Sequence, residues 1–311
     1  MKVVVTGGAG FIGSHLAEAL VGQGDNVVVL DNFSAGKEAH LSAVKDKISV
    51  IKGDIRDLDL LKSSFKDVEV VFHQAALRYV TTSVEQPHAY NDVNINGTLN
   101  VLEAARLSGV KTVVFASSSS VYGEDPKLPQ REGREDVRLS PYAITKFAGE
   151  DYCRYFHRLY GLNTVCLRYF NVFGPRQDPF AQYAAVIPKF ALCVLKGEQP
   201  PIFGSGEQSR DFTFVKDVVA ANLCAAKAKR VGGKEFNVAS GSPVTVNVLA
   251  QKISQILAST VQANYHPARP GDVLYSYADM SRSRKMLKLP VFTPFDDALK
   301  VTVEWFRDCT R

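Results

Sequence analysis

The stretch that decides the fold is VVVTGGAGFIG, residues Val3–Gly13. Three valines precede glycines spaced three apart, and an amphipathic segment comes next, which predicts a buried strand, a tight turn and a helix. In such a turn Gly7 permits the bend, Gly10 lets a pyrophosphate approach the backbone, and Gly13 lets the helix lie close to the strand. Because the start of the helix offers free N–H groups and partial positive charge, the stretch predicts a dinucleotide site.

A second apolar run indicates which dinucleotide binds. It extends from Asn26 to Leu30 and ends at Asp31, about 20 residues beyond the turn. A carboxylate at this place accepts hydrogen bonds from an adenosine ribose, which favours NAD over NADP. Lys37 keeps NADP open, because a cation near that strand end could hold a 2′-phosphate instead.

Composition places the chain among globular proteins with a full core. It has 311 residues, of which 46% are hydrophobic, enough for one large α/β unit or two lobes. No apolar stretch approaches the roughly 18 residues of a membrane span, and no signal-type segment precedes the first strand, so we expect a cytosolic protein that binds no membrane. The formal charge of +5 is spread without a Lys/Arg block, which gives no support to nucleic-acid binding.

The cysteines and histidines indicate neither a disulfide framework nor a metal site. The five cysteines are widely spaced and form no CxxC pair, and the six histidines show no HxxxH or HExxH spacing. We therefore expect no metal, and reduced, mostly buried thiols at Cys153, Cys166, Cys193, Cys224 and Cys309.

The first half of the chain alternates strand and helix patterns. Apolar runs from Ile48 to Ile51, Val68 to Phe72 and Val110 to Phe115 each end in small or polar residues. This pattern is typical of parallel strands buried on both faces, whose C-terminal ends face a ligand crevice. The predicted fold class is therefore α/β, a doubly wound parallel sheet of the Rossmann type.

The remaining patterns set the expected helices and domains. Residues 57–65, beginning with an aspartate, and residues 94–108, ending before a glycine, are predicted helices. We expect an NAD-binding domain over residues 1–170, which also receives chain from about 210–240. Residues 171–311 are expected to form mainly a smaller α+β lobe that binds the substrate.

The second informative stretch is SPYAITK, which begins at Ser140. Ser140 suits an N-cap and Pro141 suits the first helical position, so a helix should run from here to about Tyr160. Tyr142 and Lys146 then share one face. The ammonium and the helix N-terminus both favour the phenolate, so we expect a tyrosine pKa lowered toward neutrality, as a general base requires.

Together these residues resemble an extended short-chain dehydrogenase/reductase, and within it the UDP-glucose/UDP-N-acetylglucosamine 4-epimerase family. The resemblance runs the length of the chain. It implies that Ser118 hydrogen-bonds the sugar 4-hydroxyl, that Tyr142 is the base and that Lys146 holds the nicotinamide ribose. It is carried by the glycine turn, Asp54-Ile55, Ala75-Ala76, Asn94, Ser117-Ser118 before Val121-Tyr122-Gly123, and Tyr142 with Lys146.

With the residues derived above, the resemblance implies three sets of site residues. The catalytic set is Ser118, Tyr142 and Lys146. The set that binds a tightly held NAD is Gly7, Gly10, Phe11, Ile12, Gly13, Asp31, Asn32, Asp54, Ile55, Ala75, Ala76, Asn94, Tyr142 and Lys146. The set that binds a UDP-sugar is Arg78, Ser118, Tyr142, Asn171, Ala185, Val186, Arg210, Arg269, Asp272 and Ser276.

The C-terminal half carries the polar residues for the nucleotide. Asn171 comes after a strand and precedes a glycine-proline turn, and the resemblance places it on the diphosphate side of the substrate. Arg210 and Arg269 could neutralise a diphosphate or form surface ion pairs, and their match to the family's uridine-diphosphate residues favours the first. Asp272 could hold the uridine ribose. Asp217 is expected to cap the helix that begins beside it.

The two residues after the active-site serine indicate the reaction. The resemblance implies an Asp-Glu pair there in sugar 4,6-dehydratases and a Ser-Glu arrangement in uronate decarboxylases. This chain has Ser119 and Ser120 instead. The remaining interpretation is a 4-epimerase that works through a 4-keto intermediate. A 4-keto reductase, a dehydratase or a catalytically inactive NAD-binding protein stays open as an alternative.

Small residues indicate the sugar. The resemblance implies Asn-Asn-Leu and a tyrosine at two places in epimerases restricted to unacetylated hexoses. At the same places this chain has Ala184-Ala185-Val186 and Ser276, whose small side chains make room for an N-acetyl group. The alternative is a UDP-glucuronate 4-epimerase. The resemblance implies that such enzymes have a threonine at the position of Asn171, and an arginine just after the Gly-Pro turn that receives the carboxylate. The acid Asp178 would repel a uronate. We expect UDP-glucose/UDP-galactose and UDP-N-acetylhexosamine as substrates.

The resemblance also implies a homodimer. In the family, the helix from about Asn94 and the one beginning at Pro141 pair between subunits. The apolar residues Leu107, Phe156 and Leu159 would form the contact or face the core.

Overall fold

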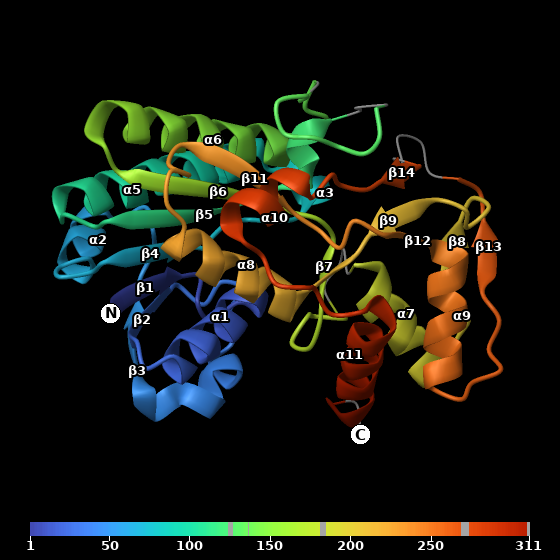
Figure 1. Cartoon of the computed structure of the whole chain (residues 1–311). Helices are drawn as coiled ribbons and strands as arrows, with labels where there is room; N and C mark the ends of the chain where they lie inside the picture. Colours follow the sequence, from blue (N-terminus) through green and yellow to red (C-terminus); the bar gives the residue numbers. More distant parts are fainter. Residues whose placement is uncertain (124–126, 136, 181–184, 269–273, 310–311) are drawn as a thin grey trace.

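The computed structural model describes residues 1–123, 127–135, 137–180, 185–268 and 274–309. A large sheet with helices on both faces forms one half of the molecule, and helices with short strands form the smaller other half (Figure 1).

The large sheet has seven strands in the order β11-β6-β5-β4-β1-β2-β3. Every pairing in it is parallel. The strand order changes direction between β1 and β4, where ligands bind in doubly wound folds. The predicted α/β Rossmann fold is thus confirmed. The strands are β1 (Lys2–Thr6), β2 (Asn26–Asp31), β3 (Ile48–Lys52), β4 (Val70–His73), β5 (Thr112–Ser118), β6 (Asn163–Tyr169) and β11 (Lys234–Val238).

Burial depends on the position of each strand in the sheet. The β-branched residues of β1, β2 and β5 are almost wholly buried, as expected for inner strands with helices on both faces. The prediction that every strand is buried on both faces is wrong for β3. Val50 on β3 is 46% exposed, because this strand forms the edge of the sheet.

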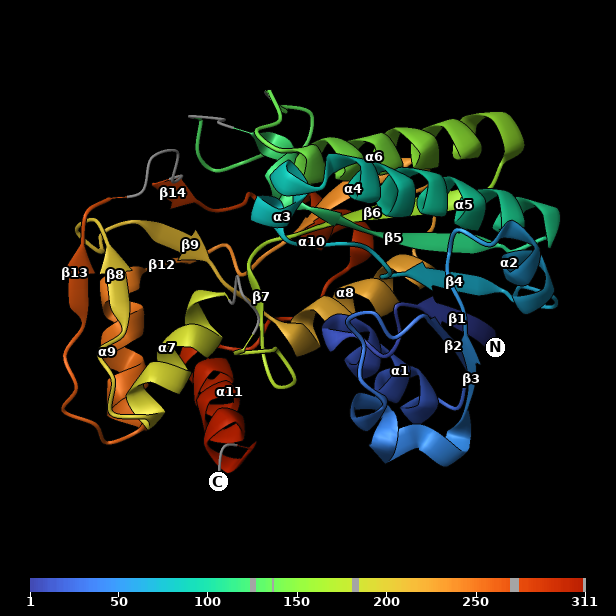
Figure 2. The same cartoon turned by 180° about the vertical axis from the view of Figure 1, so that it is seen from behind.

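Helices cover the sheet in two groups, each with its own buried core. Figure 1 shows α1 and α8 on one face, and Figure 2 shows α4, α5 and α6 on the other. The first group is α1 (Phe11–Gly22), the 3₁₀ segment η1 (Glu38–Lys47), α8 (Val215–Lys227) and α10 (Ser281–Leu287). The second is α2 (Leu58–Ser64), α3 (Val80–Glu85), α4 (Pro87–Asn91), the π-helical turn η2 (Asp92–Asn96), α5 (Gly97–Leu107) and α6 (Pro141–Tyr160).

Predicted helix signals are confirmed at two helices and wrong at a third. Asp57 accepts from the Leu60 N–H at 2.9 Å at the start of α2, and Ser140 accepts from the Ala143 N–H at 3.2 Å at the start of α6. Asp217, in contrast, lies inside the first turn of α8 and accepts from the backbone of Thr293. Its predicted capping role is therefore wrong.

The smaller half has a core of its own, in which Phe173, Phe190, Phe212, Phe214 and Phe306 pack together. Its helices are α7 (Val186–Leu195), α9 (Val246–Ile256) and α11 (Phe295–Cys309). Its short strands are β7 (Val172–Phe173), β8 (Pro201–Phe203), β9 (Ser209–Asp211), β10 (Thr213–Phe214), β12 (Pro243–Thr245), β13 (Asn264–His266) and β14 (Tyr275–Ser276). The short 3₁₀ helix η3 (Ser119–Tyr122) links β5 to the loop beyond it.

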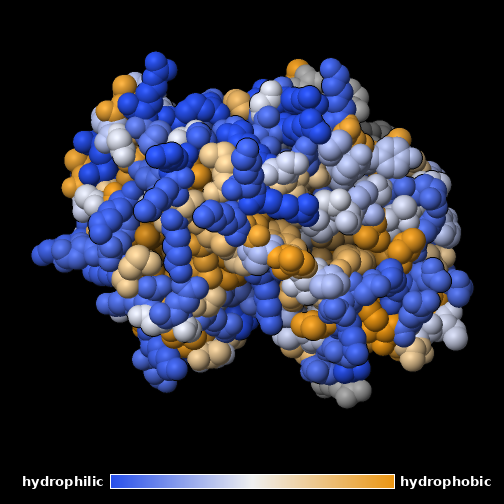
Figure 3. Space-filling view, in the orientation of Figure 1, coloured by the Kyte–Doolittle hydropathy of each residue, from blue (hydrophilic) through white to orange (hydrophobic). Residues whose placement is uncertain are grey.

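Hydrophilic side chains cover most of the face shown in Figure 3. In the part of the chain that is described, no helix is both long and apolar enough to cross a membrane. The thiols of Cys153 and Cys166 are buried and that of Cys309 is exposed.

Candidate active site

A cavity of about 990 Å³ lies along the C-terminal ends of β1, β2, β4 and β5 and extends to β9 and β14. This volume is at the upper end of the range for small-molecule sites. Residues from both halves of the molecule line the cavity, so it has room for two ligands placed end to end.

The glycine turn closes one wall of the cavity with backbone alone. Gly7 has a φ of +68°, and a Cβ there would lie 2.7 Å from the backbone N and Cα of Ala75. A Cβ on Gly13 would lie 2.2 Å from the carbonyl oxygen of Gly7. Side chains are therefore excluded at both positions, and a ligand can reach the backbone between them.

The N-terminus of α1 opens on the same wall. Gly10 is the N-cap residue, no described side chain caps the helix, and its first turn has no acidic residue. Gly10, Phe11, Ile12 and Gly13 all line the cavity. Free N–H groups and the positive end of the helix dipole meet here, so this wall fits the pyrophosphate of a dinucleotide.

Asp31 lies at the end of β2 in the cavity wall. Its carboxylate accepts from the N–H groups of Ala9 at 2.9 Å and Phe33 at 2.8 Å. Burial raises the pKa of this carboxyl group, and these hydrogen bonds act against that shift. Lys37, which kept NADP open, lies with its Nζ 3.3 Å from a carboxylate oxygen of Asp178 and is not among the described residues that line the cavity.

Asp54 and Ile55 line the next part of the wall together with Asn32 and Arg56. The Asn32 amide donates to Asp54 at 2.9 Å, and the Arg56 guanidinium bonds both Asp54 and Asp92. These hydrogen bonds, the one from Arg56 above all, hold the pKa of Asp54 well below its usual range. Sequence reasoning missed Arg56, although it directly succeeds the predicted Asp54-Ile55 pair.

Asn94, predicted to bind the cofactor, is not among the described residues that line the cavity. Its side chain is buried and bonds both the N–H and the carbonyl of Leu77, at 2.8 and 3.0 Å. It also donates to Thr145 at 3.1 Å. Asn94 therefore fixes a cavity-lining loop against helix α6, because its amide bonds the Leu77 backbone and the Thr145 hydroxyl.

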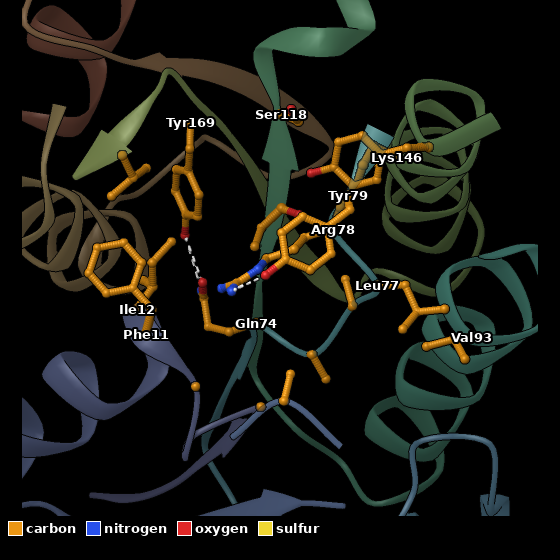
Figure 4. Close-up of a pocket in the computed structure, with 18 of the residues that line it drawn as sticks. Phe11, Ile12, Gln74, Leu77, Arg78, Tyr79, Val93, Ser118, Lys146 and Tyr169 are labelled. Carbon is orange, nitrogen blue, oxygen red and sulfur yellow. Dashed lines mark hydrogen bonds between the residues drawn. The ribbon is translucent and has the colours of Figure 1, made fainter. Parts of the chain in front are cut away.

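Ser118, Tyr142 and Lys146 meet at the end of β5, and Figure 4 shows Ser118 and Lys146 beside the cavity. The Lys146 ammonium donates to the Ala116 carbonyl at 2.8 Å and lies 6.0 Å from the centre of the Tyr142 ring. Burial lowers the pKa of Lys146 to about 8. The backbone amide of Ser120 donates to the Ser118 hydroxyl at 3.2 Å.

The predicted lowering of the Tyr142 pKa is wrong for this structure. Burial raises the pKa of Tyr142, and the hydrogen bond with Ser118 lowers it by less. The expectation placed the ammonium against the phenol, whereas Lys146 is held by the Ala116 carbonyl on the neighbouring strand. Desolvation of the phenolate therefore outweighs its stabilisation.

A buried ion pair, which sequence reasoning missed, lies near the three predicted catalytic residues. Arg168 on β6 donates twice to Glu150 on α6, at 2.8 and 2.6 Å, and Ser117 donates to the same carboxylate at 2.5 Å. Arg168 also pairs with Glu135 at 2.5 Å. These bonds join β5, β6 and α6 next to Ser118, so the network fixes the end of β5 against α6.

The predicted sugar-binding residues are only partly brought together. Arg78, Asn171, Ala185, Arg210 and Ser276 line the cavity. Figure 4 shows Arg78 next to Tyr79, to whose hydroxyl it donates at 2.8 Å. Asn171 has a φ of +33°, and its amide donates to the Asp211 carbonyl at 3.1 Å.

The other predicted residues on this side lie elsewhere. Val186 begins α7 and is not among the described residues of the lining. Arg269 and Asp272 lie outside the described residues. Arg176, which comes directly after the Gly-Pro turn, pairs with Glu18 on α1.

Two further polar side chains reach the centre of the cavity. Gln74, at the end of β4, donates to the Tyr169 hydroxyl at 3.0 Å, as Figure 4 shows. Both residues line the cavity. The signal was present in the sequence, because Gln74 comes just after a predicted buried strand and Tyr169 ends another.

The sequence of the chain is similar to those of known proteins. The sequence model of the NAD dependent epimerase/dehydratase family matches residues 3–239. A protein of Methanocaldococcus jannaschii described as a putative UDP-glucose 4-epimerase is 40% identical over 311 residues, which cover 99% of each chain.

Two solved structures are similar over the whole chain. The UDP-N-acetylglucosamine 4-epimerase of Methanobrevibacter ruminantium, in complex with UDP-N-acetylmuramic acid, has a TM-score of 0.93 and 44% identity and covers 99% of this chain and 98% of its own. The UDP-glucose 4-epimerase of Thermotoga maritima with UDP-glucose has a TM-score of 0.95 and 38% identity and covers 100% of both chains.

Proposed function

Since the chain belongs to the NAD dependent epimerase/dehydratase family, we propose that it interconverts UDP-sugars that differ in configuration at C4. Its substrates are the UDP-hexoses UDP-glucose and UDP-galactose, and also UDP-N-acetylhexosamines. The observation that carries the proposal is the meeting of Ser118, Tyr142 and Lys146 at the point where the dinucleotide wall of the cavity ends.

NAD is the cofactor, and the backbone between Gly7 and Gly13 with the start of α1 would hold its pyrophosphate. Asp31 would accept from the adenosine ribose, and Asp54 with Ile55 would flank the adenine. Lys146 would hold the nicotinamide ribose. When bound, NAD supplies the acceptor and the donor of the hydride at C4.

Tyr142 acts as the base for the sugar 4-hydroxyl. The phenolate form of Tyr142 takes the hydroxyl proton as C4 is oxidised, and the phenol so formed returns this proton when C4 is reduced on the other face. Ser118 hydrogen-bonds the same hydroxyl and keeps it in line with Tyr142. Ser118 is attached to β5 and Tyr142 to α6. Hydrogen bonds hold these two elements together, so the two side chains keep their relative positions while the 4-keto sugar turns.

The intermediate has to turn without leaving, so the nucleotide is held firmly and the sugar loosely. Arg210 and Asn171 support the first requirement from the cavity wall, and Arg269 and Asp272 are assigned to the same anchor. Ala185 and Ser276 support the second, because small side chains leave space for the hexose and for an N-acetyl group.

A uronate fits this site poorly. The arginine after the Gly-Pro turn, Arg176, is bound to Glu18. Among the described residues, Asp178 lines the cavity as a carboxylate paired with the half-exposed Lys37. Both features oppose a substrate carboxylate, which supports neutral sugars as substrates.

The chain is divided at about residue 170 into an NAD-binding domain and a lobe that binds the UDP-sugar. Residues 210–240 also belong to the NAD-binding domain. Their strand β11 pairs with β6, which supports this division. The enzyme works in the cytoplasm as a homodimer that pairs through α5 and α6. The exposure of Leu107 and Leu159 supports this interface, while Phe156 belongs to the core.

A chromatographic assay of UDP-glucose, UDP-N-acetylglucosamine and UDP-glucuronate without added NAD tests the function. We expect the first two to give their C4 epimers and the third to stay unchanged. If folded protein that contains NAD converts none of the three, the epimerase assignment is wrong.

A further inference from the structure

Gln130 lies in a segment whose backbone is fixed on both sides. Its N–H donates to the Tyr277 carbonyl at 2.8 Å, and its carbonyl accepts from the Asp279 N–H at 2.9 Å. The same carbonyl accepts from the Asn237 amide at 3.0 Å. Asn237 also accepts from the Tyr122 hydroxyl at 2.6 Å. The backbone of Gln130 is thus held by Asn237, which also bonds Tyr122, and by the segment beyond β14.

The side chain of Gln130 is buried but incompletely paired. The residue is 4% exposed and lines the cavity. Its Oε1 atom is buried without a hydrogen-bond partner among the described residues. Leaving a buried carboxamide oxygen unpaired costs free energy, and native proteins pair nearly all such groups. An acceptor kept unpaired in the wall of a binding site is available to a ligand.

The strand pairing places Gln130 beside Ser276. Gln130 forms a parallel bridge with Ala278, and side chains of paired residues point to the same face. Ser276, two residues before Ala278, shares that face, and both Gln130 and Ser276 line the cavity. Ser276 is the small residue that leaves space for a substituent larger than hydroxyl.

We propose that the Gln130 carboxamide hydrogen-bonds the acetamido group at C2 of the bound sugar, an inference that rests on the proposed epimerase function. A secondary amide carries one donor and one acceptor, and both need partners when they are buried. In the trans secondary amide the N–H and the carbonyl point in opposite directions, so a single carboxamide pairs with one of them. The unpaired Oε1 of Gln130 accepts from the acetamido N–H. Gln130 is in this way a determinant of preference for N-acetylated substrates.

The test compares kcat/KM for UDP-N-acetylglucosamine and UDP-glucose in wild-type enzyme and in Gln130→Met. Methionine keeps the length of the side chain and removes the acceptor of this hydrogen bond. We expect the ratio of the two kcat/KM values to fall about 10-fold, with UDP-glucose little changed, as for the loss of a buried hydrogen bond. The Kd of UDP, which carries no sugar, should stay the same.

Gln177→Met is the matched control. Gln177 also lines the cavity and also has a buried, unpartnered Oε1 among the described residues, but it is adjacent to Asp178 in sequence and its amide donates to the Val172 carbonyl at 3.1 Å, away from the bridge between Gln130 and Ala278. Its replacement should leave the ratio of the two sugars unchanged. Thermal unfolding of ligand-free Gln130→Met should match that of the wild type, because no hydrogen bond of the side chain oxygen is lost.

The outcomes separate this inference from the proposed function. A wild-type enzyme that converts neither sugar contradicts the epimerase assignment itself. A wild-type enzyme that converts UDP-glucose alone, or a Gln130→Met variant that loses both activities equally, overturns the role of Gln130. A fall of the ratio by the same factor in Gln177→Met overturns it as well.

Discussion

The two ends of the cavity are built in different ways. At the end proposed to bind NAD, here called the cofactor end, the glycine turn forms a wall of backbone, where a Cβ on Gly7 or Gly13 would collide with neighbouring main-chain atoms. At the other end, proposed to bind the sugar and here called the sugar end, residues from separate segments line the cavity, such as Gln130, Asn171 and Ser276. A backbone wall fits one ligand shape and tolerates little change. A wall of side chains can be altered one residue at a time, so we expect substrate preference to be set at this end.

Tyr142→Phe tests the junction of the two ends and has the largest expected effect. Removing the phenol hydroxyl removes the base for the 4-hydroxyl proton, so kcat should fall roughly 10²- to 10⁴-fold. Retained NAD and the Kd of UDP should not change, because neither end of the cavity is altered. The measurements are turnover by chromatography and binding by calorimetry. Undiminished turnover would contradict the mechanism.

Gly7→Ala tests the cofactor end. Gly24→Ala is its control, because both glycines have positive φ, +68° and +80°, but a Cβ on Gly24 has nothing within 4 Å. Both variants carry the left-handed strain of alanine, about 1 kcal/mol. Only Gly7→Ala adds the collision with Ala75.

We expect Gly7→Ala to lose bound NAD and to unfold at a clearly lower temperature than Gly24→Ala. The NAD content of purified protein and thermal unfolding measure the two effects. Equal NAD content in both variants would show that the wall is more adaptable than its contacts indicate.

Lys146 at the junction gives a pH dependence of stability. Burial lowers its pKa from 10.5 to about 8. Between these values the unfolded chain binds more protons than the folded chain, so stability should rise with pH across this window. The full rise is at most about 3 kcal/mol.

Lys146→Met removes this titration, and the comparison of the two proteins cancels the other groups. Urea unfolding of NAD-free protein between pH 8 and 10.5 should show the wild type gaining stability relative to the variant. A constant difference between the two proteins would mean that Lys146 is not desolvated.

The cofactor end could be predicted from the sequence because its signals are local. The glycine turn and the caps at Asp57 and Ser140 depend on residues within a few positions of one another, and the structure confirms these elements. The pairing of Tyr142 with Lys146 on one helix was predictable for the same reason. Their pKa values were not, because burial and the Ala116 carbonyl come from the tertiary fold.

The sugar end could be predicted only in part. The position of Gln130 depends on its pairing with a segment near residue 278. The ion pairs of Arg168 depend on Glu150 and Glu135. No spacing in the sequence encodes these pairings. Asn94 shows the reverse case, because its type and position suited a ligand contact while the fold uses it to hold Leu77.

Ser276→Tyr tests the sugar end. A tyrosine fills the space beside Gln130, so kcat/KM for UDP-N-acetylglucosamine should fall about 10-fold or more while that for UDP-glucose changes less. Ser276→Ala, which keeps the space, should leave both values near those of the wild type. If Ser276→Tyr lowers both equally, the substituent at C2 does not point to this wall.

Lys37→Ala tests the ion pair between Lys37 and the cavity-lining Asp178, and its expected effect is the smallest. Lys37 and Asp178 are 56% and 30% exposed, so the pair contributes less than about 1 kcal/mol to stability. Lys111→Ala, which breaks the similarly exposed pair with Glu69, should cost as much. Urea unfolding measures both.

The two lysine variants should differ in substrate binding. Without Lys37, the Asp178 carboxylate in the cavity wall has lost the ammonium that lies 3.3 Å from it, and it repels the diphosphate of the substrate. We expect KM for the UDP-sugar to rise about two- to threefold at low salt and to return toward the wild-type value at about 0.5 M salt, because added ions screen the repulsion. Lys111→Ala should leave KM unchanged. A salt-independent rise would mean that Lys37 shapes the wall by packing, and the sugar end would then share the rigidity of the cofactor end.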